Sequence, residues 1–171
     1  MGFMKQPAID DVRIRPYGRS DEALLRRMSV RLSGRSLHHR FFSGTPDIPE
    51  YYLRAVAGID HWNHDALVGI VDDDMVGIAE YIRNRADSSR AELAILVTDE
   101  WQQRGLGRHL MAYLAQLAFR RGIWAFDADV LLDNRGGLAA VRSGWPGVIP
   151  CHQDGAAHFR LPLGEPLVTR A

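Results

Sequence analysis

The sequence is short of the residues that build disulfide-stapled, metal-clustered or membrane-embedded proteins. Its single cysteine, Cys151, cannot form an internal disulfide and cannot supply a cysteine-rich zinc site. No apolar run approaches the roughly 18 residues that a membrane span needs. Residues 1–6 have no apolar signal core. We therefore expect a cytoplasmic protein with no membrane partner.

An excess of charge of one sign is also lacking. Lys+Arg and Asp+Glu both number 21, which gives a net charge of zero. A nucleic-acid binder gains affinity from concentrated positive charge, so we expect no nucleic-acid partner. Lysine itself is nearly absent, since Lys5 is the only one. Arginine-rich codon usage explains this scarcity; a second explanation is that an enzyme that modifies lysines carries few of its own.

The remaining composition is typical of one globular domain. The chain has 171 residues, of which 46% are hydrophobic and 25% charged. We expect that domain over residues 11–163, after a flexible lead-in (1–10) and before a C-terminal tail (164–171).

The hydrophobic pattern alternates between strand and helix periods. Helical spacing predicts helices at 20–32, 50–57, 104–121 and 134–143. Apolar runs and period-two alternation predict strands at 12–15, 66–71, 75–82, 91–97, 123–131, 145–149 and 157–161. This order predicts a mixed α/β layer whose first half is antiparallel.

Glu92 is a carboxylate within the otherwise apolar strand 91–97. Alternation places it on the same face as Ala94 and Leu96. A carboxylate that is buried without a partner is desolvated, which raises its pKa and makes it a candidate general base. The alternative is a strand-end glutamate that faces solvent or pairs with an arginine. Glu80, on the preceding strand, is a reserve candidate base, although a solvated face of the hairpin is the favoured interpretation for it.

The segment 102–108 leads directly into the longest predicted helix. Its glycines, Gly105 and Gly107, let the backbone come close to a ligand. The first N–H groups of a helix are unpaired and the helix dipole favours negative charge, so this segment predicts a pyrophosphate site. Arg104 and Arg108 can add charge-assisted hydrogen bonds. A glycine-rich turn without a ligand is the alternative.

Other nucleotide-binding motifs fit this segment poorly. A dinucleotide fingerprint needs a third glycine where Leu110 stands, and a P-loop needs a Gly-Lys-Ser/Thr ending that is absent.

The pattern Gln102-x-x-Gly105-x-Gly107 resembles the signature of the GNAT superfamily of N-acetyltransferases, and the order of elements matches as well. The resemblance implies a GNAT fold: a central, mostly antiparallel, twisted sheet of about seven strands flanked by helices, with a cofactor cleft where strands four and five splay apart. It also implies acetyl-CoA as the acyl donor and no metal. The loop would bind the pyrophosphate and the preceding strand the pantetheine arm. The implied cofactor-binding residues are Ile95, Leu96, Val97, Gln102, Gln103, Arg104, Gly105, Leu106, Gly107, Arg108 and Asn134.

A narrower resemblance, to the catalytic domain of bacterial Pat-type protein lysine acetyltransferases, rests on the segments 14–16, 37–42, 76–79 and 91–94. It implies that Glu92 is the general base and that the acceptor is a protein lysine, expected on an acyl-CoA synthetase. Because Pat-type enzymes often join this domain to others, one interpretation is that the chain is the excised catalytic domain of a longer protein. The helix after Asn134 lacks the tyrosine that many family members use as a general acid. A leaving thiolate with a pKa of about 8.5 tolerates that absence.

The implied mechanism is direct attack in a ternary complex. A lysine amine, with a pKa of about 10.4, must first lose a proton to Glu92. A backbone N–H near Leu96 would then bind the developing oxyanion. Two other functions stay open: acetylation of a small amine, and non-catalytic sensing of acyl-CoA. A metal site at His61 and His64 is disfavoured because no further ligand stands at a suitable spacing.

Overall fold

The computed structural model describes residues 6–164. The beginning of the predicted lead-in, residues 1–5, lies outside the described residues, as does the predicted tail beyond Gly164. Within the described part of the lead-in, Ile9–Asp11 forms a short 3-10 turn.

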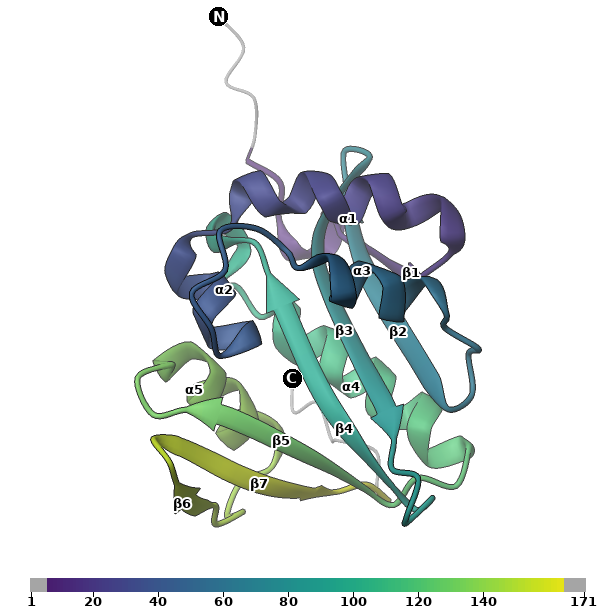
Figure 1. The fold of residues 1–171 in the computed structure, drawn as a ribbon, viewed down its shortest axis with the longest axis vertical. Coiled ribbons are helices and arrows are strands. Elements are labelled where there is room, and N and C mark those ends of the chain that lie inside the picture. The colour runs from purple at the N-terminus through teal and green to yellow at the C-terminus, as the bar shows by residue number, and fades with distance from the viewer. Residues whose placement is uncertain (1–5, 165–171) are drawn as a thin grey trace, which may run out of the picture.

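Within residues 6–164, seven strands form one sheet in the order β1-β2-β3-β4-β5-β7-β6 (Figure 1). Strands β4 and β5 pair in parallel, whereas the other neighbouring strands pair antiparallel. The predicted mixed α/β fold with a mostly antiparallel sheet is confirmed. The strands are β1 Arg13–Pro16, β2 His64–Val71, β3 Asp74–Arg83, β4 Arg90–Val97, β5 Ala125–Leu131, β6 Cys151–Gln153 and β7 Ala156–Pro162.

The helices cover the sheet unevenly. In Figure 1 the first three helices lie in front of the β1–β4 half of the sheet and α4 lies behind it, while the front of β5, β7 and β6 carries no helix. Among the described residues, no helix is both long and apolar enough to cross a membrane. The α-helices are α1 Glu22–Met28, α2 Gly34–Phe41, α3 Glu50–Ala57, α4 Leu106–Arg120 and α5 Arg135–Gly144.

Two hydrophobic cores follow from this arrangement. The front core packs side chains of α1, α2 and α3, such as Leu25 and Leu53, against one face of β2–β4, including Leu96. The back core packs α4 and α5 against the other face, where Leu93 and Phe126 lie. Strand β4 therefore contributes alternate residues to opposite cores, as its period-two pattern predicts.

The structure departs from the predicted elements in two places. The segment 34–41 forms α2, although only Ser36 and Leu37 are buried, so the segment has too short an apolar stripe to be detected. Its start is fixed by Ser33, whose side chain accepts a hydrogen bond from the Ser36 N–H. The predicted strand at 145–149 is wrong. Trp145 instead caps α5, and β6 follows as an exposed edge strand without apolar alternation.

A partly buried ion pair joins β1 to the beginning of α1. The guanidinium of Arg15 donates to both carboxylate oxygens of Asp21, at 2.6 and 2.7 Å, and the Gly18 N–H donates to the same carboxylate at 2.8 Å. Asp21 is only 2% exposed. The hydrogen bond from Arg15 holds the pKa of Asp21 below its usual range. The charged form of Asp21 therefore stabilises the fold.

Replacing Asp21 with Asn should destabilise the protein in a pH-dependent way. A lowered folded-state pKa stabilises the fold above the unfolded pKa of Asp and ceases to do so as the pH falls through the folded value. We expect D21N to lose about 1.5–3 kcal/mol of unfolding free energy at pH 7, the usual value of hydrogen bonds to a charged group. The deficit should shrink below about pH 4. Urea denaturation at pH 7 and pH 3 measures it; an equal deficit at both pH values would contradict the assignment.

Candidate functional site

The parallel strands β4 and β5 separate and leave a cavity between them. Their pairing joins Arg90–Glu92 to Ala125–Asp127, and beyond this apex the two strands diverge (Figure 1). The cavity measures about 1760 Å³ and is lined by β4, β5, α2 and the beginning of α4. All predicted site residues, Glu92 and Asn134 included, lie on its wall.

The register of β4 decides which of its backbone groups face this cavity. The Thr98 N–H donates to the Val76 carbonyl at the beginning of β3, at 3.0 Å. Leu96, two residues before Thr98, pairs with Ile78, two residues after Val76. Pairs two residues apart in an antiparallel ladder have the same hydrogen-bonding pattern, so the N–H of Leu96 also points toward β3. The N–H groups of Ile95 and Val97 point toward the cavity instead. Of the backbone N–H groups near Leu96, those of Ile95 and Val97 are therefore the ones that a ligand in the cavity can reach.

The beginning of α4 forms one end of the cavity. Gly105 precedes the helix with a φ of 86°, a left-handed conformation that favours glycine. No side chain caps this end, and the first N–H groups of an α-helix lack intrahelical partners. The N-terminus of α4, called the mouth of α4 below, therefore retains unpaired N–H donors and the positive end of the helix dipole, and both favour binding of an anion.

The two arginines of the glycine loop make contacts within the protein. Arg104 stacks over the Trp101 ring at 3.9 Å and donates to the carbonyls of Glu100 and Pro7. Arg108 donates to the Ser143 hydroxyl at 3.0 Å and so joins α4 to α5. Both line the cavity.

Gln102 joins the loop to two other walls. Its side-chain amide donates to the Val97 carbonyl at 3.0 Å and to the Ser36 hydroxyl at 2.8 Å. The same hydroxyl donates to Asp99 at 2.7 Å. Gln102 thus fixes the distance between α2 and the end of β4.

Asn134 acts as the N-cap of α5. Its side-chain oxygen accepts a hydrogen bond from the Gly137 N–H at 2.9 Å. A Cβ at position 137 would lie 2.7 Å from the Asn134 side chain, so the glycine is sterically required there. This contact explains why a glycine stands at position 137 although the residue lies within a helix.

Glu92 lies at the apex where β4 and β5 converge, on the helix-free front of the sheet. Its side chain is exposed, so of the two alternatives the structure shows the strand-end glutamate that faces solvent. The period-two pattern identified its face correctly. It could not reveal that α2 and α3 stop short of this end of β4.

A buried ionic cluster forms the wall opposite β5. Glu80 of β3 is 3% exposed. One of its carboxylate oxygens accepts from Arg40 of α2 at 2.5 Å, and the other lies 2.7 Å from Nε2 of His64. Arg40 also stacks against the ring of Tyr52, 4.9 Å away, and burial raises the pKa of that tyrosine. Because its carboxylate is engaged on both sides, Glu80 is a structural residue here rather than an available base.

Exposed apolar side chains lie beside this cluster on the cavity wall. Phe42, Tyr51 and Ile82 are 44%, 59% and 43% exposed. They come from the end of α2, from α3 and from β3. This part of the cavity can hold an apolar chain next to Glu92.

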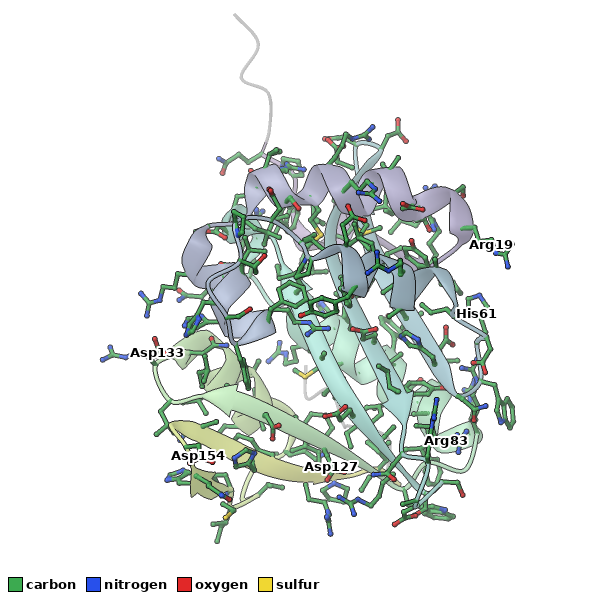
Figure 2. All side chains as sticks on the ribbon, in the orientation of Figure 1. Arg19, His61, Arg83, Asp127, Asp133 and Asp154 are labelled. Carbon is green, nitrogen blue, oxygen red and sulfur yellow. The ribbon has the colours of Figure 1, made fainter. Side chains whose placement is uncertain are left out.

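Helix α2 also reaches across the opening to the β5–α5 loop. Arg35 donates to the Asp133 carbonyl at 3.3 Å, and Nε2 of His39 lies 3.4 Å from the Asp133 carboxylate. Figure 2 labels Asp133 at this crossing. The sequence pattern does not predict these contacts, because they depend on a helix at 34–41 that the pattern does not reveal.

Comparison with known proteins agrees with this geometry. The acetyltransferase (GNAT) family matches residues 33–145. An acetyltransferase of Pseudomonas aeruginosa is 30% identical over 122 residues, which cover 67% of this chain and 65% of that protein. The acetyltransferase Pat of Mycolicibacterium smegmatis is 34% identical over 112 residues, which cover 61% of this chain and 32% of Pat. The chain thus matches less than two thirds of the length of either relative.

A solved structure resembles the whole architecture. The GNAT domain of PAT from S. lividans superposes with a TM-score of 0.82 at 25% identity, covering 89% of this chain and 90% of that domain. The splayed strands, the uncapped mouth of α4 and the family match together lead to one conclusion: this chain belongs to the GNAT family of acetyltransferases.

Proposed function

We propose that this chain transfers an acetyl group from acetyl-CoA to the ε-amine of a protein lysine, with an acyl-CoA synthetase as the expected acceptor. The observation that carries the proposal is the alignment of three features along one cavity: the mouth of α4, the open edge of β4 and the carboxylate of Glu92. Each matches one part of the reaction, namely the diphosphate, the pantetheine arm and the acceptor amine.

The donor is held by backbone groups. The helix mouth at Leu106–Arg108 receives the diphosphate, because unpaired N–H groups and the helix dipole both favour an anion there. The pantetheine amides pair with the cavity-facing N–H and C=O groups of β4, as a further strand would. This arrangement points the thioester toward Glu92, at the far end of the splay.

The transfer is a direct displacement. Glu92 takes a proton from the acceptor ammonium, and the amine nitrogen attacks the thioester carbonyl carbon. The C–N bond forms, the carbonyl oxygen becomes an oxyanion, and the cavity-facing N–H groups of β4 are the donors available to it. As the oxyanion collapses, the C–S bond breaks and coenzyme A leaves as a thiolate. The new amide nitrogen gives up its second proton, which reaches the thiolate through water, and Glu92 returns its own proton to solvent.

Two observations support a lysine as the acceptor. The exposed apolar wall made by Phe42, Tyr51 and Ile82 suits the four-carbon stem of lysine, which packs on apolar surface while its ammonium reaches a charge. A Pat acetyltransferase and the GNAT domain of a PAT protein are also among the similar proteins.

The acceptor is tested directly by incubating the chain with acetyl-CoA and a purified acyl-CoA synthetase, followed by mass spectrometry of the synthetase. We expect acetylation at a defined lysine. Acetylation of small amines with an unmodified synthetase would contradict the protein-lysine proposal. Tight binding of acetyl-CoA with no acetylation of any amine would support a sensing module.

Replacing Glu92 with Gln should abolish most turnover and leave donor binding intact. Gln cannot accept the proton, and general base catalysis contributes about 10²–10⁴-fold to rate. We expect kcat to fall by at least about 10², with the Kd for acetyl-CoA within about twofold of wild type. Thiol release and isothermal titration calorimetry measure the two quantities. Unchanged turnover at saturating acceptor would remove Glu92 from this role.

Placing a carboxylate at the mouth of α4 should weaken donor binding without unfolding the protein. An added Cβ at Gly107 meets only Ile95 and Val97, at 3.9 Å, so the fold has room for a side chain. An acidic residue in the first turn is favourable for the helix itself. We expect G107D to bind acetyl-CoA at least tenfold more weakly than the matched neutral variant G107N, a difference of about 1.4 kcal/mol. Equal affinity of the two variants would contradict the diphosphate site.

A further inference from the structure

A row of side chains crosses the apex of the splay on the front of the sheet. Ile82 of β3 pairs with Glu92 of β4, Glu92 with Asp127 of β5, and Asp127 with Arg160 of β7. Neighbouring strands lie about 4.8 Å apart, so the candidate base stands directly beside a second carboxylate. Figure 2 labels Asp127 near the point where β4 and β5 converge.

Each oxygen of Asp127 is engaged by an arginine. Oδ2 accepts from Nη2 and Nε of Arg90, at 2.7 and 3.0 Å. Oδ1 accepts from Nε of Arg160 at 3.3 Å. The side chain of Asp127 is 25% exposed, and it lines the same cavity as Glu92.

Three carboxylates lie near two arginines at this apex. Glu92 and Asp127 contribute two negative charges, and Arg90 and Arg160 two positive ones. Asp87 is the third carboxylate: hydrogen bonds from Ser89, together with the charges of Arg90 and Arg160, hold its pKa below the usual range. Asp129 pairs with His158, and Glu80 pairs with Arg40.

Arg90 is placed so that it could reach Glu92 as well. The two residues are separated by one position on β4, so their side chains project from the same face of the strand. An arginine bound to Glu92 would occupy the carboxylate that must receive the acceptor amine and would weaken it as a base.

We propose that Asp127 is a positioning residue for acetyl transfer, which binds Arg90 and Arg160 and thereby keeps the carboxylate of Glu92 free for the acceptor ammonium. This inference rests on the proposed function, and it assigns to Asp127 no contact with the substrate. If Asp127 is removed, Arg90 and Arg160 are released, and catalysis slows because a released arginine can bind Glu92.

The test compares D127N with two double variants, R90Q/D127N and D127N/R160Q. We expect D127N to lower kcat/KM for the acyl-CoA synthetase roughly two- to fivefold, the scale of one partly exposed ion pair. R90Q/D127N should recover most of that loss, because the released arginine is gone. D73N, the same change in the exposed β2–β3 turn, is the matched control and should match wild type.

The pH profile separates this role from a purely structural one. Released arginines favour the anionic form of Glu92, so the acidic limb of kcat/KM should move to lower pH in D127N and return in R90Q/D127N. Wild-type activity of D127N would overturn the proposal. So would a folded R90Q/D127N as inactive as D127N, since Asp127 would then act directly on the acceptor or only on the fold. If D127N does not fold, the two double variants carry the test. Double variants that fold but are inactive would also overturn the proposal.

A crystal structure of D127N tests the geometry without an acceptor. We expect the guanidinium of Arg90 within about 4 Å of the Glu92 carboxylate, the separation of an ion pair. Arg90 turned away from Glu92 would overturn the proposal. This result is independent of the proposed function, which fails separately if the wild-type chain acetylates no amine.

Discussion

The incomplete pairing of β4 with β5 is the constraint on which the site depends. Each strand pairs along most of its length with an antiparallel neighbour, β4 with β3 and β5 with β7. The two strands share only the three residue pairs at the apex. Because sheets twist, strands held by different neighbours separate as they extend beyond their last common pair. The edge of β4 is left with backbone donors and acceptors that a ligand can satisfy, since such groups are costly to leave unpaired.

The walls of the cavity are held in place by side chains from distant parts of the chain. Gln102 and Asp99 fix the beginning of α2 through Ser36, and Glu80 fixes its end through Arg40. These bonds are short and partly buried, so they hold α2 in place although it has few buried apolar residues. Several residues expected to hold the cofactor therefore also build the scaffold. A substitution at Gln102 or Asn134 would change the shape of the cavity as well as its ligand contacts.

The electrostatics of the site are local. The chain has no net charge, yet the cavity has an anion-attracting end at α4 and a carboxylate pair at the apex. One end of the cavity favours an anion and the other a cation. The two do not interfere, because the field of a helix dipole falls off within about one turn. The arginines beside Asp127 act at the other end. Net charge therefore carried no information about the site.

The sequence by itself determined the order of most elements, the face of β4 on which Glu92 lies and the glycine loop that opens α4. These features follow from local periodicity and backbone conformation, which neighbouring residues dictate. Tertiary structure decided the exposure of Glu92, the orientation of the Leu96 N–H, the helix at 34–41 and the row from Ile82 to Arg160. Each depends on strand register or on contacts between segments far apart in the chain, and no local pattern encodes which strands become neighbours.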